Sequence, residues 1–435
     1  MRINPFGKLG RAALTFALGL QIGTAAAQAP EITLWSHIVH QQVIEGKRGG
    51  GAVNIGEAFE KAANVKLSWT TIPLDQMQDK ILRELNISRT KTDIVFLLNT
   101  WATPSLLARL VPMDAMLKSE PIRDMADVSP AMVKAFSDKS GIKAIPIRHN
   151  PQLLFYNKEV FATRGVASEP ATFEDFVEAA KKATFKRADG AQVYGFAFET
   201  NQAEDMVVVL RAFGADVITP DFKIKINDPA AIKAVTALNE LFVAGALPPN
   251  LGILTPADLQ NLMSQGLISM GIFGDNYFER FNAPDQSQVA GKVWFAPFPT
   301  SKDVSGVRYA SSAGFWAMGI PANGDPAARE RAYKLIAHLS QPDVQLTLAL
   351  NNNSPIRASI YANPAYAATV PYADVVQKVL PIAAPPFPAF AGAKEAERIF
   401  LEETVAAIVG RKPVKAALDA AAAGIERVMK REGLM

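Results

Sequence analysis

Aromatic and polar side chains follow several of the expected strands, at the positions where each apolar run ends. Three runs are followed in this way: by Trp35 and His37, by Asn99 and Trp101, and by Asp275, Asn276 and Tyr277. Flat aromatic rings stack on the C–H faces of a sugar, while carboxylate, amide and imidazole groups hydrogen-bond to its hydroxyls. In open α/β sheets such side chains meet outside the carboxyl ends of parallel strands. The pattern predicts a binding site for a hydroxylated small molecule.

Four more candidates come from their position in the chain. Arg148 and His149 lie in an extended segment, residues 141–157, that looks like a connection between domains. Trp316 lies in the motif Gly314-Phe315-Trp316 and is expected to line a cleft. Arg357 follows Ser354-Pro355, and its guanidinium is suited to bidentate hydrogen bonds with two vicinal hydroxyls.

Each candidate also has a purely structural interpretation. Core packing is the alternative for the tryptophans, and we prefer Trp101 to Trp35 as a stacking platform because Trp35 continues the inward alternation of its strand. Gly274-Asp275-Asn276 is also the chemistry of a turn. The pair at 148–149 fits a simple hinge equally well, and the alternative for Arg357 is an exposed salt bridge.

Catalytic and metal motifs find little support. His37 and His40 are three residues apart, but no third metal ligand is near them. Gly49-Gly50-Gly51 lacks the Lys-Ser/Thr ending of a phosphate loop. Asp275 and Glu279 imitate a glycosidase pair, although two carboxylates on one turn are commonly just solvated charges. The chain has no cysteine, which excludes disulfides, thiolate metal sites and a cysteine nucleophile. We expect no enzymatic activity, no cofactor and no metal.

The first 27 residues have the pattern of a cleavable secretory signal. Basic Arg2, Lys8 and Arg11 precede an apolar run at 12–22, and small residues at 25–27 favour cleavage before Gln28. A buried N-terminal helix is the alternative. The full chain has 45 Lys and Arg against 42 Asp and Glu, and this segment holds three of the bases and no acid. The remainder is formally neutral, so we expect no nucleic-acid partner and no attraction to an anionic membrane. The signal pattern, together with the absence of a cysteine for lipid attachment, predicts a periplasmic location without a membrane anchor.

Strand and helix signals alternate along the rest of the chain. Expected strands at 31–35, 65–69 and 93–98 enclose helices at 55–63 and from 73 onward, with a polar segment at 37–51. A capping box at Thr172 and Asp175 opens a helix at 172–183, and helices at 230–244 and 256–265 precede a strand at 267–273. Two helices separated at 410–413 end the chain. This alternation predicts an α/β fold with mixed, mainly parallel sheets flanked by helices.

Five segments in this order resemble one known family. They are LLFYNKEVF at 153–161, PATFEDF at 170–176, QGLISM at 265–270, the stretch from 313 to Ser354-Pro355, and the final segment at 406–425. Together they are similar to the family 1 extracellular solute-binding proteins of ABC importers, in the branch of maltose and multiple-sugar binding proteins. The resemblance implies a type II-like periplasmic-binding-protein fold of two lobes, with ligand in the cleft between them.

The resemblance also implies a division of the chain and a set of partners. After the signal at 1–27, we expect lobe 1 at 28–145, lobe 2 at 146–300, a return to lobe 1 at 301–355, and a return to lobe 2 with the C-terminal helices at 356–435. Hinge crossings are expected near 144–150, 300–309 and 355–359. The expected ligand is a sugar or polyol, delivered by a monomer to the permease of an ABC importer. A glycerol-phosphate ester, an organic anion or a peptide is the alternative ligand, and a carbohydrate-active enzyme is the alternative function.

Overall fold

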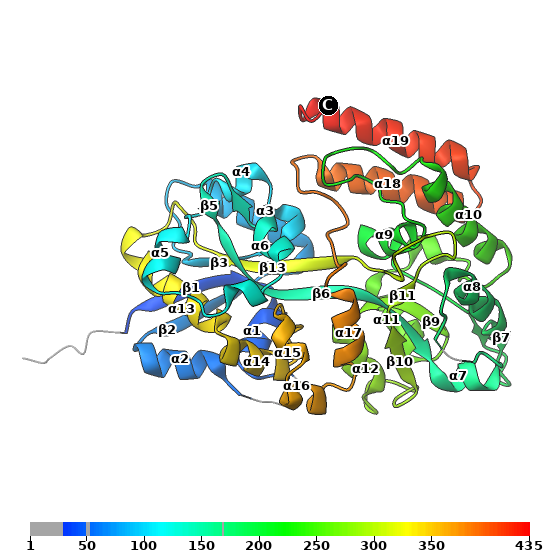
Figure 1. Cartoon of the computed structure of the whole chain (residues 1–435), viewed down its shortest axis with the longest axis horizontal. Coiled ribbons are helices and arrows are strands. Elements are labelled where there is room, and N and C mark those ends of the chain that lie inside the picture. The colour runs from blue at the N-terminus through cyan, green and yellow to red at the C-terminus, as the bar shows by residue number, and fades with distance from the viewer. Residues whose placement is uncertain (1–28, 49–52, 168) are drawn as a thin grey trace, which may run out of the picture.

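The computed structural model describes residues 29–48, 53–167 and 169–435. The predicted signal at 1–27 and the glycines at 49–51 lie outside the described residues. The described chain forms two α/β lobes that lie side by side (Figure 1). This arrangement confirms the predicted fold class.

One seven-stranded sheet runs through both lobes. Its order is β10-β6-β13-β3-β1-β2, and β9 also pairs with β6. The strands are β1 (Glu31–Ser36), β2 (Lys66–Thr71), β3 (Ile94–Leu98), β6 (Ala144–Asn157), β9 (Met270–Gly274), β10 (Val293–Ala296) and β13 (Ala313–Gly319). β1, β2 and β3 are parallel, whereas β13 is antiparallel to both β3 and β6.

The 14-residue strand β6 connects the lobes. Its first part pairs with β13 as far as Pro151, and from Gln152 onward it pairs with β9 and β10. The extended segment predicted at 141–157 is therefore a single strand shared by two sheet regions. Three two-stranded pairs complete the β-structure of the described chain: β4 (Ser137–Asp138) with β5 (Gly141–Ile142), β7 (Phe185–Lys186) with β8 (Gln192–Val193), and β11 (Phe298–Pro299) with β12 (Tyr309–Ala310).

Helices cover both lobes (Figure 1). Those of the first lobe and the hinge side are α1 (Ile38–Ile44), α2 (Ile55–Ala63), α3 (Leu74–Asn86), α4 (Pro104–Leu107), α5 (Asp114–Ser119), α6 (Pro130–Ala135), α13 (Arg329–Ser340), α14 (Pro342–Leu350), α15 (Ala358–Tyr361), α16 (Pro364–Thr369) and α17 (Ala373–Val379). Those of the second lobe are α7 (Lys158–Thr163), α8 (Phe173–Lys182), α9 (Ala203–Arg211), α10 (Pro229–Val243), α11 (Pro256–Ser264), α12 (Phe278–Asn282), α18 (Ala393–Ile408) and α19 (Val414–Arg431). Helix α1 occupies the stretch that we expected to be a polar segment.

Local sequence explains several helix boundaries. The Asn54 side chain accepts a hydrogen bond from the backbone N–H of Glu57 at the start of α2, and Asn64 ends that helix in a left-handed conformation. At α8, Thr172 and Asp175 form the predicted capping box in both directions. Pairing across the molecule then decides how these elements assemble.

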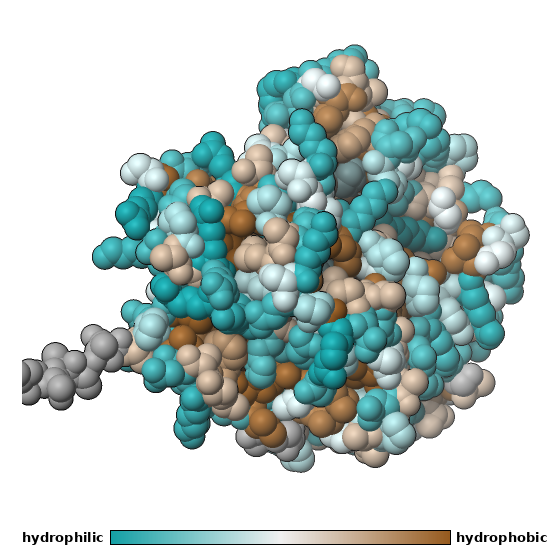
Figure 2. Space-filling model, turned by 60° about the vertical axis from the view of Figure 1, so that its left-hand side comes forward, coloured by the Kyte–Doolittle hydropathy of each residue, from teal (hydrophilic) through white to brown (hydrophobic). Residues whose placement is uncertain are grey.

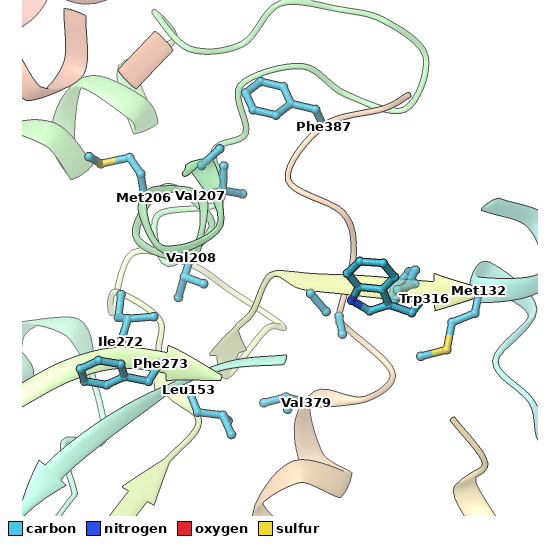
Figure 3. Close-up of a cluster of buried hydrophobic side chains, with 14 of the residues drawn as sticks. Met132, Leu153, Met206, Val207, Val208, Ile272, Phe273, Trp316, Val379 and Phe387 are labelled. Carbon is cyan, nitrogen blue, oxygen red and sulfur yellow. The ribbon is translucent and has the colours of Figure 1, made fainter. Parts of the chain in front are cut away.

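Apolar side chains fill the interior of both lobes up to their junction. Figure 3 shows Met206, Val207 and Val208 of α9 above Ile272 and Phe273 of β9. The buried cluster continues to Trp316 and Met132 on the first-lobe side. On the face shown in Figure 2, hydrophilic side chains project over most of the surface, with small hydrophobic patches between them. No described helix is both long and apolar enough to span a bilayer.

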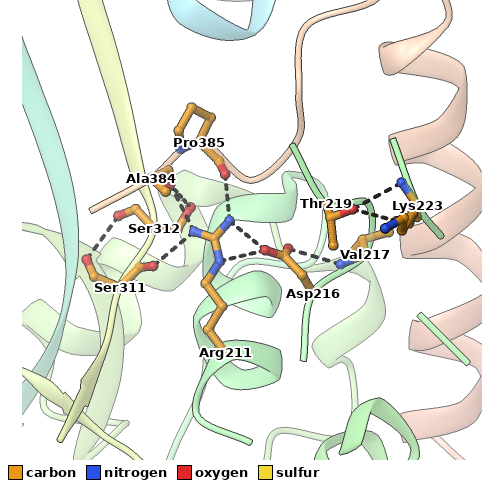
Figure 4. A network of polar contacts seen from close by, with 9 residues as sticks. All are labelled: Arg211, Asp216, Val217, Thr219, Lys223, Ser311, Ser312, Ala384 and Pro385. Atoms are coloured by element: carbon orange, nitrogen blue, oxygen red, sulfur yellow. Dashed lines mark hydrogen bonds and ion pairs between the residues drawn. The ribbon is translucent and has the colours of Figure 1, made fainter. Parts of the chain in front are cut away.

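An arginine network fixes the segments that join the lobes (Figure 4). Arg211 of α9 donates to the carbonyls of Ser311, Ala384 and Pro385 at 3.0, 2.9 and 2.7 Å. It also pairs with Asp216 at 3.1 Å. Ser311 precedes β13, and residues 380–392 connect α17 to α18, so one side chain ties two interlobe segments to the second lobe.

The third crossing differs from the expected one near 355–359. The Arg357 side chain is fully buried and donates to the carbonyls of Arg123, Asp124 and Ser340, which all belong to the first lobe. The chain then forms α15, α16 and α17 before it reaches the second lobe through residues 380–392 (Figure 1). The assignment of all of 356–435 to lobe 2 was therefore wrong at its start, because Arg357 anchors that part to lobe 1.

Candidate functional site

Trp316 lies at the centre of an aromatic cluster at the lobe junction. In the sheet it stands between Arg148 of β6 and Leu98 of β3. The ring of Trp101 meets it edge-on, with centroids 5.4 Å apart, and the imidazole of His40 lies 4.6 Å away. Trp101 follows β3 directly in the short 3₁₀ helix Asn99–Trp101, as expected for a residue at the carboxyl end of a strand.

Three polar side chains around this cluster carry atoms with no hydrogen-bond partner. The unpartnered atoms are Nδ2 of Asn99, Nε of Arg148 and Nε2 of His40. The other amide atom of Asn99, Oδ1, accepts a hydrogen bond from the backbone N–H of Phe315 at 2.7 Å. These residues are 3%, 5% and 4% exposed. Buried polar atoms in native proteins are nearly always paired, so unpaired ones gathered in one place indicate a site for a bound molecule.

Two amide side chains converge on Gly274 at the end of β9. A Cβ atom at this glycine would lie 2.5 Å from Asn150 Oδ1 and 2.7 Å from Asn276 Oδ1. Both oxygens are buried and have no partner. Two more oxygens are also unpartnered, Oε1 of Gln152, which lies two residues after Asn150 on β6, and Oε1 of Glu199. Because no side chain occupies position 274, the two amides reach the junction from β6 and from the 3₁₀ helix Asp275–Tyr277 (η4).

Asp275 joins the two lobes at the same junction. It is 2% exposed, and both of its oxygens accept from the Ser354 hydroxyl, at 2.8 and 2.7 Å. Burial raises the pKa of Asp275 to about 6, and burial lowers the pKa of Arg148 to about 10 although Asp275 lies close enough to oppose that change. Neither charge has an ion-pair partner within 4 Å among the described residues, so both remain under-compensated.

A cavity of about 100 Å³ adjoins Asp275. Its lining includes the aromatic side chains Phe278, Tyr366 and Tyr372 and the polar side chains Glu279, Asn352, Asn353 and Ser354. Glu279 accepts a hydrogen bond from Asn352 Nδ2 at 2.7 Å, which is a second polar contact between the lobes. A hollow with aromatic walls and a few polar groups is the usual composition of a small-molecule pocket.

The histidines at the first-lobe edge lie in a positive environment. His37 begins α1, where its ring accepts weakly from the backbone N–H of Val39 at 3.5 Å. The pKa values of His37 and His40 are lowered, first by burial and then by the charges of Arg148 and Arg48. Both rings are therefore neutral at pH 7. No group of three or more His, Cys, Asp or Glu in the described parts of the chain is arranged to hold a metal ion.

Three of the proposed site residues lie elsewhere or face another way. Arg357 is a fully buried anchor of lobe 1 and lies 3.9 Å from Asp127, so it forms an ion pair, but a buried one instead of the exposed one that we expected. His149 points to the opposite side of β6 from Arg148, and its Nε2 lies 3.4 Å from the Tyr361 hydroxyl. Trp35 is half-buried, while Leu34 and Ser36 beside it are fully buried. The inward alternation of β1 is therefore the reverse of the one we expected.

Tyr277 does lie near the junction. It packs against Phe273 and Phe281, and its hydroxyl accepts from Gln260 Nε2 at 3.0 Å. Burial raises its pKa, and the nearby charge of Glu199 adds to the effect. Tyr277 is thus held by the second lobe and forms part of the wall beside Asn276.

Sequence reasoning missed several junction residues. Glu199 follows the apolar stretch 193–198 and repeats the pattern used for the other strands, so that signal was present. Tyr366 lies in α16 and Tyr372 directly precedes α17, and no sequence pattern places them at the cavity. Asn150 was not missed, because it lies in the extended segment at 141–157 that was expected to connect the domains, but only its approach to Gly274 places it at the junction.

A group of buried and half-buried carboxylates lies near the start of α9 in the second lobe. Burial raises the pKa of Glu199 to about 7 and that of Glu204 to about 8, and repulsion from Glu397 adds to both. The pKa of Asp205 is also raised, by burial and by Glu199. Glu397 Oε1 accepts from the backbone N–H of Ala203 at 2.8 Å, and Asp205 accepts from that of Glu199. The start of α9 therefore gathers acids whose charged forms repel one another.

Known proteins share this architecture. The maltose-bound MalE3 of T. maritima matches with a TM-score of 0.78 and 22% identity, over 92% of this chain and 100% of that one. A solute-binding protein from Agrobacterium radiobacter K84 in complex with ribitol gives 0.76 and 22%, over 92% and 98%. At this identity the likeness shows the fold.

Sequence relatives lead to the same group. An ABC transporter-binding protein of Deinococcus radiodurans is 24% identical over 367 residues, covering 82% of this chain and 83% of the relative. A Brucella abortus (strain 2308) relative, named only as a binding protein, is 22% identical over 235 residues. That match spans about half the length of the Brucella protein, 54%. The model of the family described as bacterial extracellular solute-binding protein matches residues 46–346. This chain belongs to the bacterial extracellular solute-binding protein family.

Proposed function

We propose that this protein captures a sugar or polyol between its lobes and delivers it to the permease of an ABC importer. The observation that carries the proposal is the set of buried polar atoms without partners around Trp316 and Gly274, at the junction of the two lobes. Trp101 and Trp316 supply flat surfaces for the C–H faces of such a ligand, and amide, guanidinium and carboxylate groups meet its hydroxyls. Structural neighbours with bound maltose, ribitol and D-mannitol support this ligand class.

Lobe closure provides the transport signal. Cleft contacts come from β3 and β6 on one side and from β9 and η4 on the other, so all of them form together only when the lobes are closed. A ligand that contacts both lobes shifts the open–closed equilibrium toward the closed form. The closed form then docks on the permease, without chemical change to the ligand.

The proposal includes export from the cytoplasm. Residues 1–27 act as a cleavable signal, and the mature protein works in the periplasm as a monomer. Mass spectrometry of the protein from a periplasmic extract is expected to show Gln28 as the first residue. An intact N-terminus in that fraction would contradict the cleavage.

Ligand screening tests the central claim. A thermal-shift screen of sugars and polyols is expected to raise the melting temperature for at least one of them, because a ligand that binds only the native state stabilises it. Calorimetry on the hit is then expected to show at least tenfold weaker binding for Trp101→Ala and for Asp275→Ala. Asp189→Ala, at an exposed turn of the second lobe, serves as the control with unchanged affinity. Unchanged affinity in both junction variants would remove the site from the proposal.

A further inference from the structure

Hydrogen-bond donors without acceptors surround Trp316 on three sides. Arg148 is its neighbour on β6, Asn99 follows the neighbouring strand β3, and His40 lies against its ring. The orientation of the Asn99 amide is fixed, because its oxygen receives the Phe315 N–H and only the Nδ2 donors remain free. His40 Nδ1 lies 2.8 Å from the Ser36 hydroxyl, and in the tautomer that accepts from this hydroxyl, Nε2 carries the proton and is a third free donor.

Arg148 is the strongest member of this group. A guanidinium remains charged at every physiological pH and has five N–H donors. No hydrogen bond or ion pair joins it to another described residue, although the residue is 5% exposed. Asp275 is nearby, but its oxygens are engaged by Ser354, and Arg48 adds a second positive charge on the same side. A buried charge without hydrogen bonds is costly, which is the condition that a bound anion relieves.

Acceptors without donors lie next to this donor group, further along β6 and at the end of β9. Oxygens of Asn150, Gln152, Glu199 and Asn276 are buried and unpartnered. The oxygens of Asn150 and Asn276 converge over Gly274, where the Nδ2 of Asn150 also lies. Such groups receive O–H protons from a ligand. Along β6, the free donor at Arg148 is thus followed by free acceptors at Asn150 and Gln152, so donors beside Trp316 adjoin acceptors over Gly274.

We infer that the ligand is a sugar acid, whose carboxylate lies among Arg148, Asn99 and His40 and whose hydroxyls donate to the amides over Gly274. A carboxylate only accepts hydrogen bonds, so it suits a position that is lined by donors. A hydroxyl at that position would also need an acceptor for its own proton. A carboxylate also compensates the guanidinium charge, which a neutral polyol leaves uncompensated. Arg148 is the one buried guanidinium among the described residues around Trp316, and it matches one negative charge better than a phosphate dianion. This inference rests on the proposed function and narrows its ligand class.

Matched ligand pairs test the inference on the full mature protein. Calorimetry compares D-gluconate with D-glucitol and D-galacturonate with D-galactose, within a panel of aldonates, uronates and their neutral counterparts from the common pentoses and hexoses. We expect the best acid to bind at least 100-fold more tightly than its neutral counterpart. The dissociation constant of the acid is expected to rise with salt concentration much less than that of a surface-bound ion, because the site is buried.

Two variants test the placement of the carboxylate. Asn99→Asp keeps an oxygen for the Phe315 N–H and replaces the free donor by a carboxylate oxygen, so the fold is preserved while the acid is repelled. It is expected to weaken acid binding at least 30-fold and binding of the neutral counterpart less than threefold. Arg148→Gln is expected to weaken acid binding at least 100-fold. Asn64→Asp adds the same charge at an exposed position and serves as the control, and thermal melts check that each variant folds.

The results of these experiments distinguish a failure of the sugar-acid inference from a failure of the proposed function. If a neutral sugar or polyol binds as tightly as its acid, or a sugar phosphate binds more tightly, the inference fails and the proposed function stands. If no sugar, polyol or sugar acid binds, the proposed function fails as well. If the acid binds tightly but neither variant weakens it, the carboxylate does not lie beside Trp316.

Discussion

Replacing Glu204 with glutamine is expected to stabilise the protein, and to do so increasingly as the pH rises. Glu204 lies in the first turn of α9, close to Glu199 and Glu397. Burial and repulsion from these two carboxylates disfavour its charged form and raise its pKa to about 8. Glutamine keeps the shape and polarity of the side chain but removes the charge.

The magnitude follows from the pKa values. The folded-state pKa of about 8 exceeds the ordinary value of 4.5 by about 3.5 (8 minus 4.5), which corresponds to about 5 kcal/mol at about 1.4 kcal/mol per pKa unit. A carboxyl with a raised pKa costs nothing below the unfolded-state value, because both states are then protonated. The cost grows as the pH rises from about 4.5 and is complete above about 8. Since Glu199 and Glu397 titrate together with it, we expect about 2–3 kcal/mol of stabilisation at pH 8.

Urea unfolding at pH 5, 6.5 and 8 measures the effect. The difference in unfolding free energy between Glu204→Gln and the wild type should be small at pH 5 and largest at pH 8, with an unchanged dependence on urea. Glu178→Gln, at an exposed position of α8, is the control and should show no comparable trend. A difference that stays flat across this range, or that has the opposite sign, would refute the reasoning about the buried acids.

Three further predictions concern single positions. Gly274→Ala would place a Cβ 2.5 Å from Asn150 Oδ1, so we expect calorimetry to show at least tenfold weaker ligand binding. The free energy of unfolding in urea should change by less than about 1 kcal/mol, because only the ends of side chains must move. Arg357→Met leaves three carbonyls of lobe 1 without a donor and is expected to lower the unfolding free energy by roughly 3–5 kcal/mol. Ligand affinity should not change, and weaker ligand binding by this variant would show that Arg357 belongs to the site. Thr172→Ala removes the capping box of α8 and is expected to cost about 1 kcal/mol in the same assay, whereas Thr172→Ser should retain most of it.

Residues near the ends of strands show how far sequence patterns reach. Trp101 and Asn276 follow apolar runs, and the structure places both at the lobe junction. Position after a strand is a local property, so the sequence carries it. Trp35 also follows the rule, but its facing was predicted wrongly, because a two-residue period does not say which of its two faces is inward.

The position of Arg357 could not be predicted from local sequence patterns. Its sequence surroundings predicted either a ligand contact or an exposed ion pair, and the structure shows a buried anchor. Its three acceptors come from residues 123, 124 and 340, and no local pattern records an encounter between segments so far apart. The same holds for Tyr366 and Tyr372, which reach the cavity because α15–α17 return to the first lobe before the chain crosses.

By itself, the sequence determined the α/β class, most helices and strands, and the order of segments that resembles one family. These follow from periodicity, capping and turn chemistry, which act over a few residues. Only the tertiary structure decided which polar atoms are left without partners at the lobe junction, and that donors beside Trp316 adjoin acceptors over Gly274. The physical reason is that a hydrogen bond is satisfied or unsatisfied in three dimensions, after β6, β9 and β13 have brought distant residues together.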